Sequence, residues 1–128
     1  MKSYRELQIW QKAKEITKNT YIVTRLFPAQ EQYALASQMN RSAVSITSNI
    51  AEGWARGSTK DFLRFLYITR GSIAELETQF TLANDLKYIN GETLLIAEQQ
   101  LTELNKMLSS LITKLKERTH TKSLIANP

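Results

Sequence analysis

The feature that most restricts the fold is a row of apolar residues, mostly leucines, near the end of the chain. The row is Leu94, Ala97, Leu101, Leu104, Leu108, Leu111 and Leu115. Steps that alternate between three and four residues keep successive side chains on one face of an α-helix. The row therefore predicts an amphipathic helix over about residues 91–118, whose apolar face has to be buried against other helices.

Three earlier stretches show the same spacing and predict helices over about residues 4–26, 31–54 and 59–87. Phe27-Pro28 ends the first, because the residue before a proline avoids the helical region. Gly53 and Gly57 are expected to break the second, since glycine is unfavourable in a helix and suits its end. Ser58 is a candidate N-cap for the third helix, and Asn90 or Gly91 starts the fourth.

The breaks between these helices are about four residues long, so consecutive helices have to run antiparallel. The 128 residues suffice for one domain with a real core. We therefore predict an all-α, antiparallel, up-down-up-down four-helix bundle over residues 1–118. Residues 119–128 are polar and aperiodic, which predicts a frayed C-terminal tail.

The third helix carries apolar residues on a second face. Leu63, Tyr67, Gly71 and Ala74 lie roughly opposite its core-facing row. A helix that is apolar nearly all round is usually buried. This pattern favours a second copy of the chain packing there, with Gly71 and Ala74 allowing close approach. The alternative is a broad intramolecular core with a few apolar residues left at the surface, which is normal.

Positive charge is concentrated in the first half of the sequence. The net charge is +5, and residues 1–70 hold eleven Lys and Arg against five Asp and Glu. This asymmetry favours a polyanionic partner, either RNA or DNA, although a solubilising surface would look the same. The candidate phosphate-binding residues are Arg41, Arg56, Lys60, Arg64 and Arg70.

Glu52 stands near the end of the second predicted helix, where a carboxylate opposes the negative end of the helix dipole. It is expected to need a cationic partner, which Arg56 or Arg41 can supply. Asn49, Glu52 and Arg56 are therefore a candidate polar lock at the corner between the second and third helices. The same three residues are also compatible with a functional polar site.

No pattern in the sequence points to catalysis, a cofactor or a metal. The chain has no cysteine and one histidine, His120, in the predicted tail. Thiolate metal sites and histidine-based catalytic pairs are therefore excluded. There is no phosphate-binding glycine motif, and a di-iron site needs Glu-x-x-His on two helices, which a chain with one histidine cannot supply. We expect a non-enzymatic cytoplasmic protein, with neither a signal peptide nor a segment apolar enough to enter a membrane.

Several motifs resemble one bacterial family, the four-helix-bundle proteins encoded in intervening sequences of large-subunit ribosomal RNA genes. They are Tyr4-Arg5-Glu6-Leu7-Gln8-Ile9-Trp10, Ser48-Asn49-Ile50-Ala51-Glu52-Gly53 and Gly71-Ser72-Ile73-Ala74-Glu75-Leu76-Glu77. The resemblance extends to about residue 116. It implies a homopentameric ring and kinship with the accessory variability determinants of diversity-generating retroelements, which assist a reverse transcriptase. By position, it implies a polar set of Arg41, Asn49, Glu52, Arg56 and Arg64.

Three functions remain open at this point. The first is an oligomeric protein that binds nucleic acid, in particular structured RNA. The second is an adaptor that binds another protein, such as a retroelement reverse transcriptase. The third is a structural protein whose only partner is itself.

Overall fold

The computed structural model describes the backbone of residues 2–126 and the side chains of residues 2–119. All regular structure in that part of the chain is helical. The four α-helices are α1 (Gln8–Thr24), α2 (Leu35–Ala55), α3 (Thr59–Asp85) and α4 (Gly91–Ala126). Two short 3-10 helices, Tyr4–Glu6 and Ala29–Glu31, precede α1 and α2. The prediction of an all-α four-helix fold is therefore confirmed.

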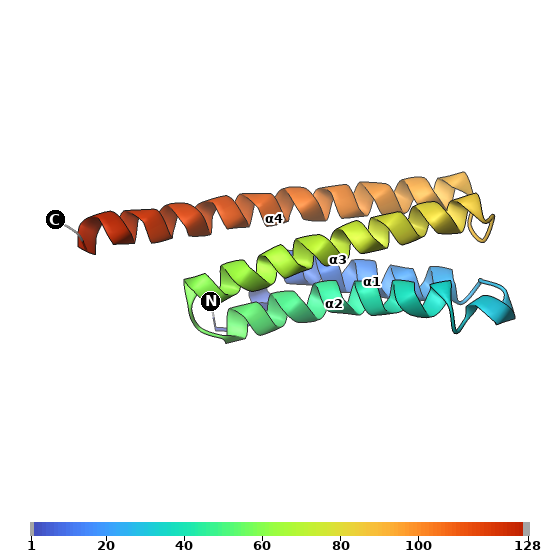
Figure 1. Cartoon of the computed structure of the whole chain (residues 1–128), viewed down its shortest axis with the longest axis horizontal. Coiled ribbons are helices and arrows are strands. Elements are labelled where there is room, and N and C mark those ends of the chain that lie inside the picture. Colours follow the sequence, from blue (N-terminus) through green and yellow to red (C-terminus); the bar gives the residue numbers. More distant parts are fainter. Residues whose placement is uncertain (1, 127–128) are drawn as a thin grey trace.

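The helices lie side by side along one axis, and each short connection reverses the direction of the chain (Figure 1). Each helix packs against its sequence neighbours, and α4 closes the bundle against α1. The contact between α2 and α3 is the most extensive of the four, and that between α1 and α4 is the smallest. The N-terminal end of α3 thus lies beside the C-terminal end of α2. No described helix is both long and apolar enough to cross a membrane.

The predicted rows of apolar residues form the core. Met39, Ile46, Leu66, Ile73 and Leu104 are fully buried at its centre. In the last row, Leu94 and Leu111 are only half-buried and pack at the edge of the core. Some buried hydroxyl groups bond within their own helix, as Thr69 Oγ1 does by donating to the carbonyl of Phe65 at 2.9 Å. Others bond to a neighbouring helix, as Thr24 Oγ1 does by donating to Asn40 Oδ1 at 2.9 Å. The spacing of three and four residues therefore identified the inward face of every helix.

Three helix boundaries differ from the prediction. The first segment is interrupted at Leu7, whose backbone is extended, because Ser3 caps a separate 3-10 turn. The second helix begins at Leu35 instead of about residue 31. The Gln32 side chain donates instead to the carbonyls of Thr24 and Phe27, which completes the end of α1. The fourth helix continues to Ala126 rather than ending at about residue 118.

The predicted helix caps are confirmed, and of the two predicted glycine breaks one is confirmed and one is wrong. Ser58 caps α3, with its Oγ accepting from the backbone N–H of Asp61 at 3.1 Å. Asn90 caps α4 by accepting from the N–H of Thr93 at 2.8 Å. Gly57 follows the last turn of α2 with a φ of +83°, a conformation that suits glycine. Gly53, in contrast, does not break α2 but lies inside it, buried against α3.

Candidate nucleic-acid interface

The corner where α2 meets α3 holds three of the predicted basic residues: Arg56 at the C-cap of α2, and Lys60 and Arg64 in the first turns of α3. The Cζ atoms of Arg56 and Arg64 lie 5.1 Å and 4.7 Å from the centre of the Phe65 ring. Cation–π contacts of this kind contribute about 0.5–1 kcal/mol at an exposed site. Two guanidinium groups from different helices are therefore held over one ring.

The position of Phe65 depends on Gly53. Phe65 is buried, and its Cβ would lie only 2.5 Å from a Cβ added at Gly53. Only glycine lets α2 and α3 approach this closely, so the ring sits between the two helices with the arginines above it. The role of Gly53 is therefore in packing, because its lack of a side chain fixes the position of the Phe65 ring beneath Arg56 and Arg64.

A second group of cations surrounds Tyr67, where α3 faces α4. Arg70 Cζ lies 5.4 Å from the Tyr67 ring centre, and Lys116 Nζ lies 5.3 Å from it. Arg70 also donates from Nη2 to Ser109 Oγ on α4, at 3.2 Å. Lys116 was not among the predicted site residues. The spacing of Tyr67 and Arg70 on one helix face could have suggested their contact, but nothing in the sequence brings Lys116 to them.

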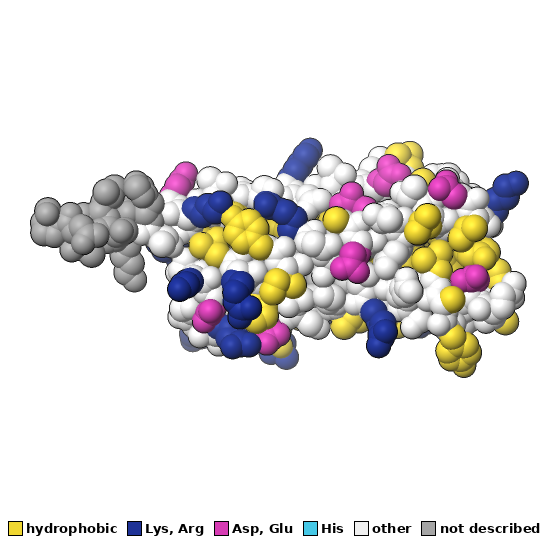
Figure 2. Space-filling model, viewed as in Figure 1, with side chains coloured by type: hydrophobic (Ala, Val, Ile, Leu, Met, Phe, Trp, Pro, Cys, Tyr) yellow, Lys and Arg dark blue, Asp and Glu magenta, His cyan; other side chains and the backbone are white. Residues whose placement is uncertain are grey.

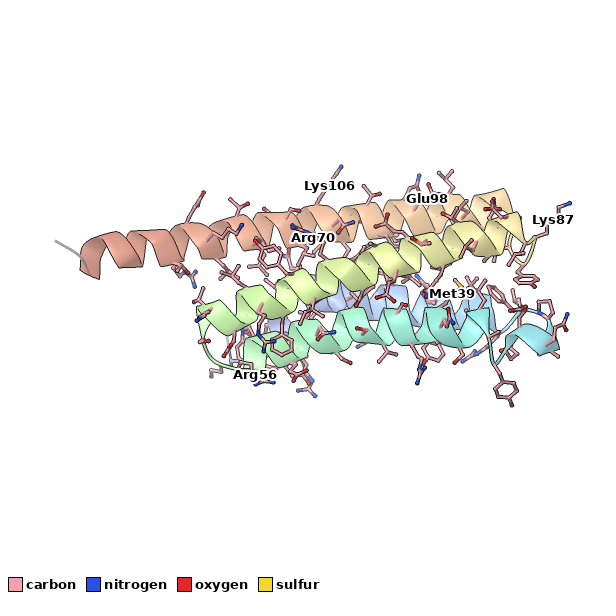
Figure 3. All side chains as sticks on the ribbon, in the orientation of Figure 1. Met39, Arg56, Arg70, Lys87, Glu98 and Lys106 are labelled. Atoms are coloured by element: carbon pink, nitrogen blue, oxygen red, sulfur yellow. The ribbon has the colours of Figure 1, made fainter. Side chains whose placement is uncertain are left out.

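These two groups lie toward the same end of the bundle. Figure 2 shows dark blue cationic side chains around yellow apolar ones at this end, beside the C-terminal half of α4. Figure 3 places Arg56 at the C-terminal end of α2 and Arg70 between α3 and α4. The two groups together, which we call the basic end, comprise Arg56, Lys60, Arg64, Phe65, Tyr67, Arg70 and Lys116.

Arg41 is not part of the basic end. It lies fifteen residues before Arg56 in the same helix, or about 22 Å at about 1.5 Å per residue. Its neighbours form a polar depression between α2 and α3 that includes Ser45, Ser72 and Glu75. The sequence placed Arg41 with the other cations on residue type alone, and the structure separates it from them along the helix.

The predicted polar lock is divided in two. Arg56 Nη2 and Glu52 Oε1 form an ion pair at 3.0 Å, with both side chains about half exposed. Asn49 takes no part in this pair. Its Nδ2 donates to the backbone carbonyl and to the hydroxyl of Ser45, at 2.8 Å and 2.9 Å. The Ser45 hydroxyl lies 2.9 Å from that of Ser72, so Asn49 belongs to a link between the middles of α2 and α3.

The four residues predicted to bind a second copy have different environments. Leu63 is half-buried and packs against the bundle's own core. Tyr67 is 40% exposed between its two cations. Gly71 and Ala74 are exposed, and nothing lies within 4 Å of a Cβ added at Gly71. The second face of α3 is therefore open only at Gly71 and Ala74, because Leu63 is half-buried and cations lie over Tyr67.

Among the described residues, no group of three or more His, Asp or Glu could hold a metal ion. The side chain of His120 lies outside the described residues.

The pKa of one tyrosine side chain is shifted. The hydrogen bond from Tyr88 to Glu31 raises the pKa of Tyr88, and partial burial and the negative charge of Glu31 raise it further. This pair joins the 3-10 helix that precedes α2 to the connection between α3 and α4, at the opposite end of the bundle from the basic end.

Comparison with known proteins agrees with this architecture. Residues 5–110 match the family described as 23S rRNA-intervening sequence protein. The chain belongs to this family. A solved structure from Bacteroides thetaiotaomicron, a protein of unknown function from the S23 ribosomal protein family, is 28% identical with a TM-score of 0.75. The match covers 81% of this chain and 97% of that one. Among curated proteins, none matches significantly. The family resemblance seen in the sequence is confirmed, and the kinship with retroelement accessory proteins stays a prediction.

Proposed function

We propose that this 23S rRNA-intervening sequence protein is a non-enzymatic, oligomeric protein that binds structured RNA at its basic end. The observation that carries the proposal is a row of cations, which runs from the C-cap of α2 along the N-terminal half of α3: Arg56, Lys60, Arg64 and Arg70. Each of the three arginines in this set lies on an aromatic ring, which holds its guanidinium group in place.

The charge balance at the basic end supports an anionic ligand. Glu52 neutralises Arg56 in part, whereas Lys60, Arg64 and Arg70 form no ion pair among the described residues. Arginine suits phosphate because its planar donors can contact two oxygens at once. A row of cations along α3 can therefore follow an RNA backbone, and the family's link to ribosomal RNA genes favours RNA over DNA.

The test is binding of a labelled RNA hairpin to the full chain, measured by fluorescence anisotropy at several KCl concentrations. The logarithm of affinity should fall linearly with the logarithm of salt, by roughly 0.7–0.9 for each phosphate contact. Arg64→Gln should lower the slope by about one, and Lys87→Gln, at the opposite end of the bundle, should leave it unchanged. Absence of binding at low salt would refute the proposal and favour the protein adaptor.

Self-assembly into a ring, with five copies as the resemblance implies, is part of the same proposal. A closed ring needs two different surfaces on each copy. The exposed stripe around Gly71 and Ala74 is one of them. An apolar groove between α1 and α4, with Ile22 and Ile96 exposed at its edge, supplies the other.

Light scattering of the purified protein tests the ring directly. The wild type should have about five times the mass of one chain, and either Ala74→Glu or Ile96→Glu should give single chains. Glu98→Gln, on the exposed side of α4, is the matched control and should leave the mass unchanged. A wild-type protein with the mass of a single chain would refute self-assembly without affecting the RNA proposal.

A further inference from the structure

Tyr67 is unusual among the exposed aromatic residues because two cations from different helices lie close to its ring. Arg70 approaches from α3 and Lys116 from α4, at 5.4 Å and 5.3 Å from the ring centre. Ser109 holds the Arg70 guanidinium group through a hydrogen bond of 3.2 Å. These contacts join α3 to α4 and bring two cationic groups to one partly exposed aromatic ring.

The positive charges of Arg70 and Lys116 beside Tyr67 are not balanced by a nearby carboxylate in the described part of the chain. Two like charges within reach of one ring repel each other, although the ring attracts each of them. Among the residues with described side chains, neither Arg70 nor Lys116 pairs with a carboxylate. A bound phosphate would remove the repulsion between the two cations. The side chain of Tyr67 is 40% exposed, so a ligand can reach it from solvent.

An aromatic ring flanked by two cations matches a nucleotide better than it matches a phosphate alone. Proteins that bind unpaired nucleotides stack the base on an aromatic side chain and contact the backbone with positive charges. A continuous RNA duplex offers no free base face, since its bases are stacked on each other. The shape and chemistry of the Tyr67 site therefore select an unpaired nucleotide.

We propose that Tyr67, Arg70 and Lys116 form a stacking site for one unpaired base of the RNA, with the two cations contacting its flanking phosphates. This inference rests on the proposed RNA binding and makes it more specific. The ligand becomes a hairpin with an unpaired loop, or a bulged helix, in place of a uniform duplex. It also reassigns Tyr67, which the sequence placed in the contact between copies.

The experiment compares two RNAs on the full chain: a hairpin with an unpaired purine loop, and a blunt duplex of the same stem. Tyr67→Leu removes the aromatic ring and Tyr67→Phe keeps it. Tyr33→Leu is the control, because Tyr33 is 96% exposed on the turn that precedes α2. Anisotropy gives the affinities, and light scattering gives the mass of each variant.

Tyr67→Leu should weaken hairpin binding by roughly ten- to hundredfold, the loss expected when a stacking partner is removed. Duplex binding should change by less than about twofold, and Tyr67→Phe and Tyr33→Leu should match the wild type for both RNAs. An unchanged hairpin affinity for Tyr67→Leu, or equal losses for both RNAs, overturns the stacking site. A fall in mass of that variant also overturns it, since Tyr67 would then join copies of the chain.

The outcomes separate this inference from the proposal on which it rests. If the wild type binds hairpin and duplex with the expected salt dependence but Tyr67→Leu binds as well, only the stacking site fails. If the wild type binds neither RNA at low salt, the RNA function fails and the stacking site fails with it.

Discussion

Substitution of Gly53 by alanine tests how closely α2 and α3 pack. Alanine is favoured over glycine within a helix by about 0.8–1 kcal/mol, so the local effect is stabilising. The new Cβ, however, would lie 2.5 Å from the Cβ of Phe65 and 3.2 Å from Cδ1 of Phe62. A Cβ cannot rotate away from its backbone, so the two helices have to separate.

Overpacking of a core typically costs about 1–3 kcal/mol, and this contact belongs at the upper end of that range. We therefore expect Gly53→Ala to lower the free energy of unfolding by about 2 kcal/mol after its helical gain is included. For a chain of this length, such a loss lowers the midpoint of thermal unfolding by roughly 6–10 °C.

Gly71→Ala is the matched control, because Gly71 also lies inside a helix but a Cβ there has open space around it. This variant should gain the full helical preference, about 0.8–1 kcal/mol. Urea unfolding followed by circular dichroism, at one protein concentration, measures both. The free energies of the two variants should differ by about 3 kcal/mol. Equal stabilisation of both proteins would refute the close approach at Gly53.

Gly53→Ala should also change the arrangement of the arginines at the basic end. Phe65 supports Arg56 and Arg64, so helix separation at Gly53 should also weaken the binding of RNA under conditions where the variant is folded. Normal RNA affinity in a folded Gly53→Ala protein would show that the ring is not needed to position the arginines.

Three further predictions concern single contacts. Ser58→Ala removes the N-cap of α3 and should cost about 1 kcal/mol in urea unfolding, whereas Ser58→Gly should cost only a few tenths of that. The raised pKa of Tyr88 stabilises the fold fully below the ordinary tyrosine pKa of about 10, and this contribution is lost as pH rises through the folded value. The wild type should therefore lose more stability above about pH 10 than Tyr88→Phe, in thermal melts across that range. Lys12→Met breaks the 3.0 Å ion pair with Glu103 between α1 and α4, where Glu103 is well exposed. It should cost at most about 1 kcal/mol at low salt, and the difference from the wild type should vanish in about 1 M NaCl.

The core could be predicted from the sequence because it depends on a short-range repeat. Residues such as Ile46, Ile73 and Leu104 face inward wherever a helix of period 3.6 carries them. The caps Ser58 and Asn90 and the left-handed turn at Gly57 also depend on neighbouring residues alone. The error at the start of α2 came where a side chain acts across a turn, since Gln32 bonds to the end of the preceding helix.

The candidate site could be predicted only in part, because it depends on which helix ends meet. The sequence identified Arg56, Lys60 and Arg64 as neighbours, since they lie close together in the chain. It also grouped Arg41 with them, whereas the length of α2 places Arg41 away from them. Nothing in it indicated that Lys116 would approach Tyr67, or that Gly53 would serve packing instead of ending a helix.

The amino-acid sequence by itself determined that this chain forms helices, which face of each is buried, and where most of them stop. These properties follow from repeats and caps within a few residues. The tertiary structure decided which charges gather at one end and which aromatic rings support them. Antiparallel packing brings together residues as far apart as Arg70 and Lys116, and contacts over such separations in sequence leave no local pattern to read.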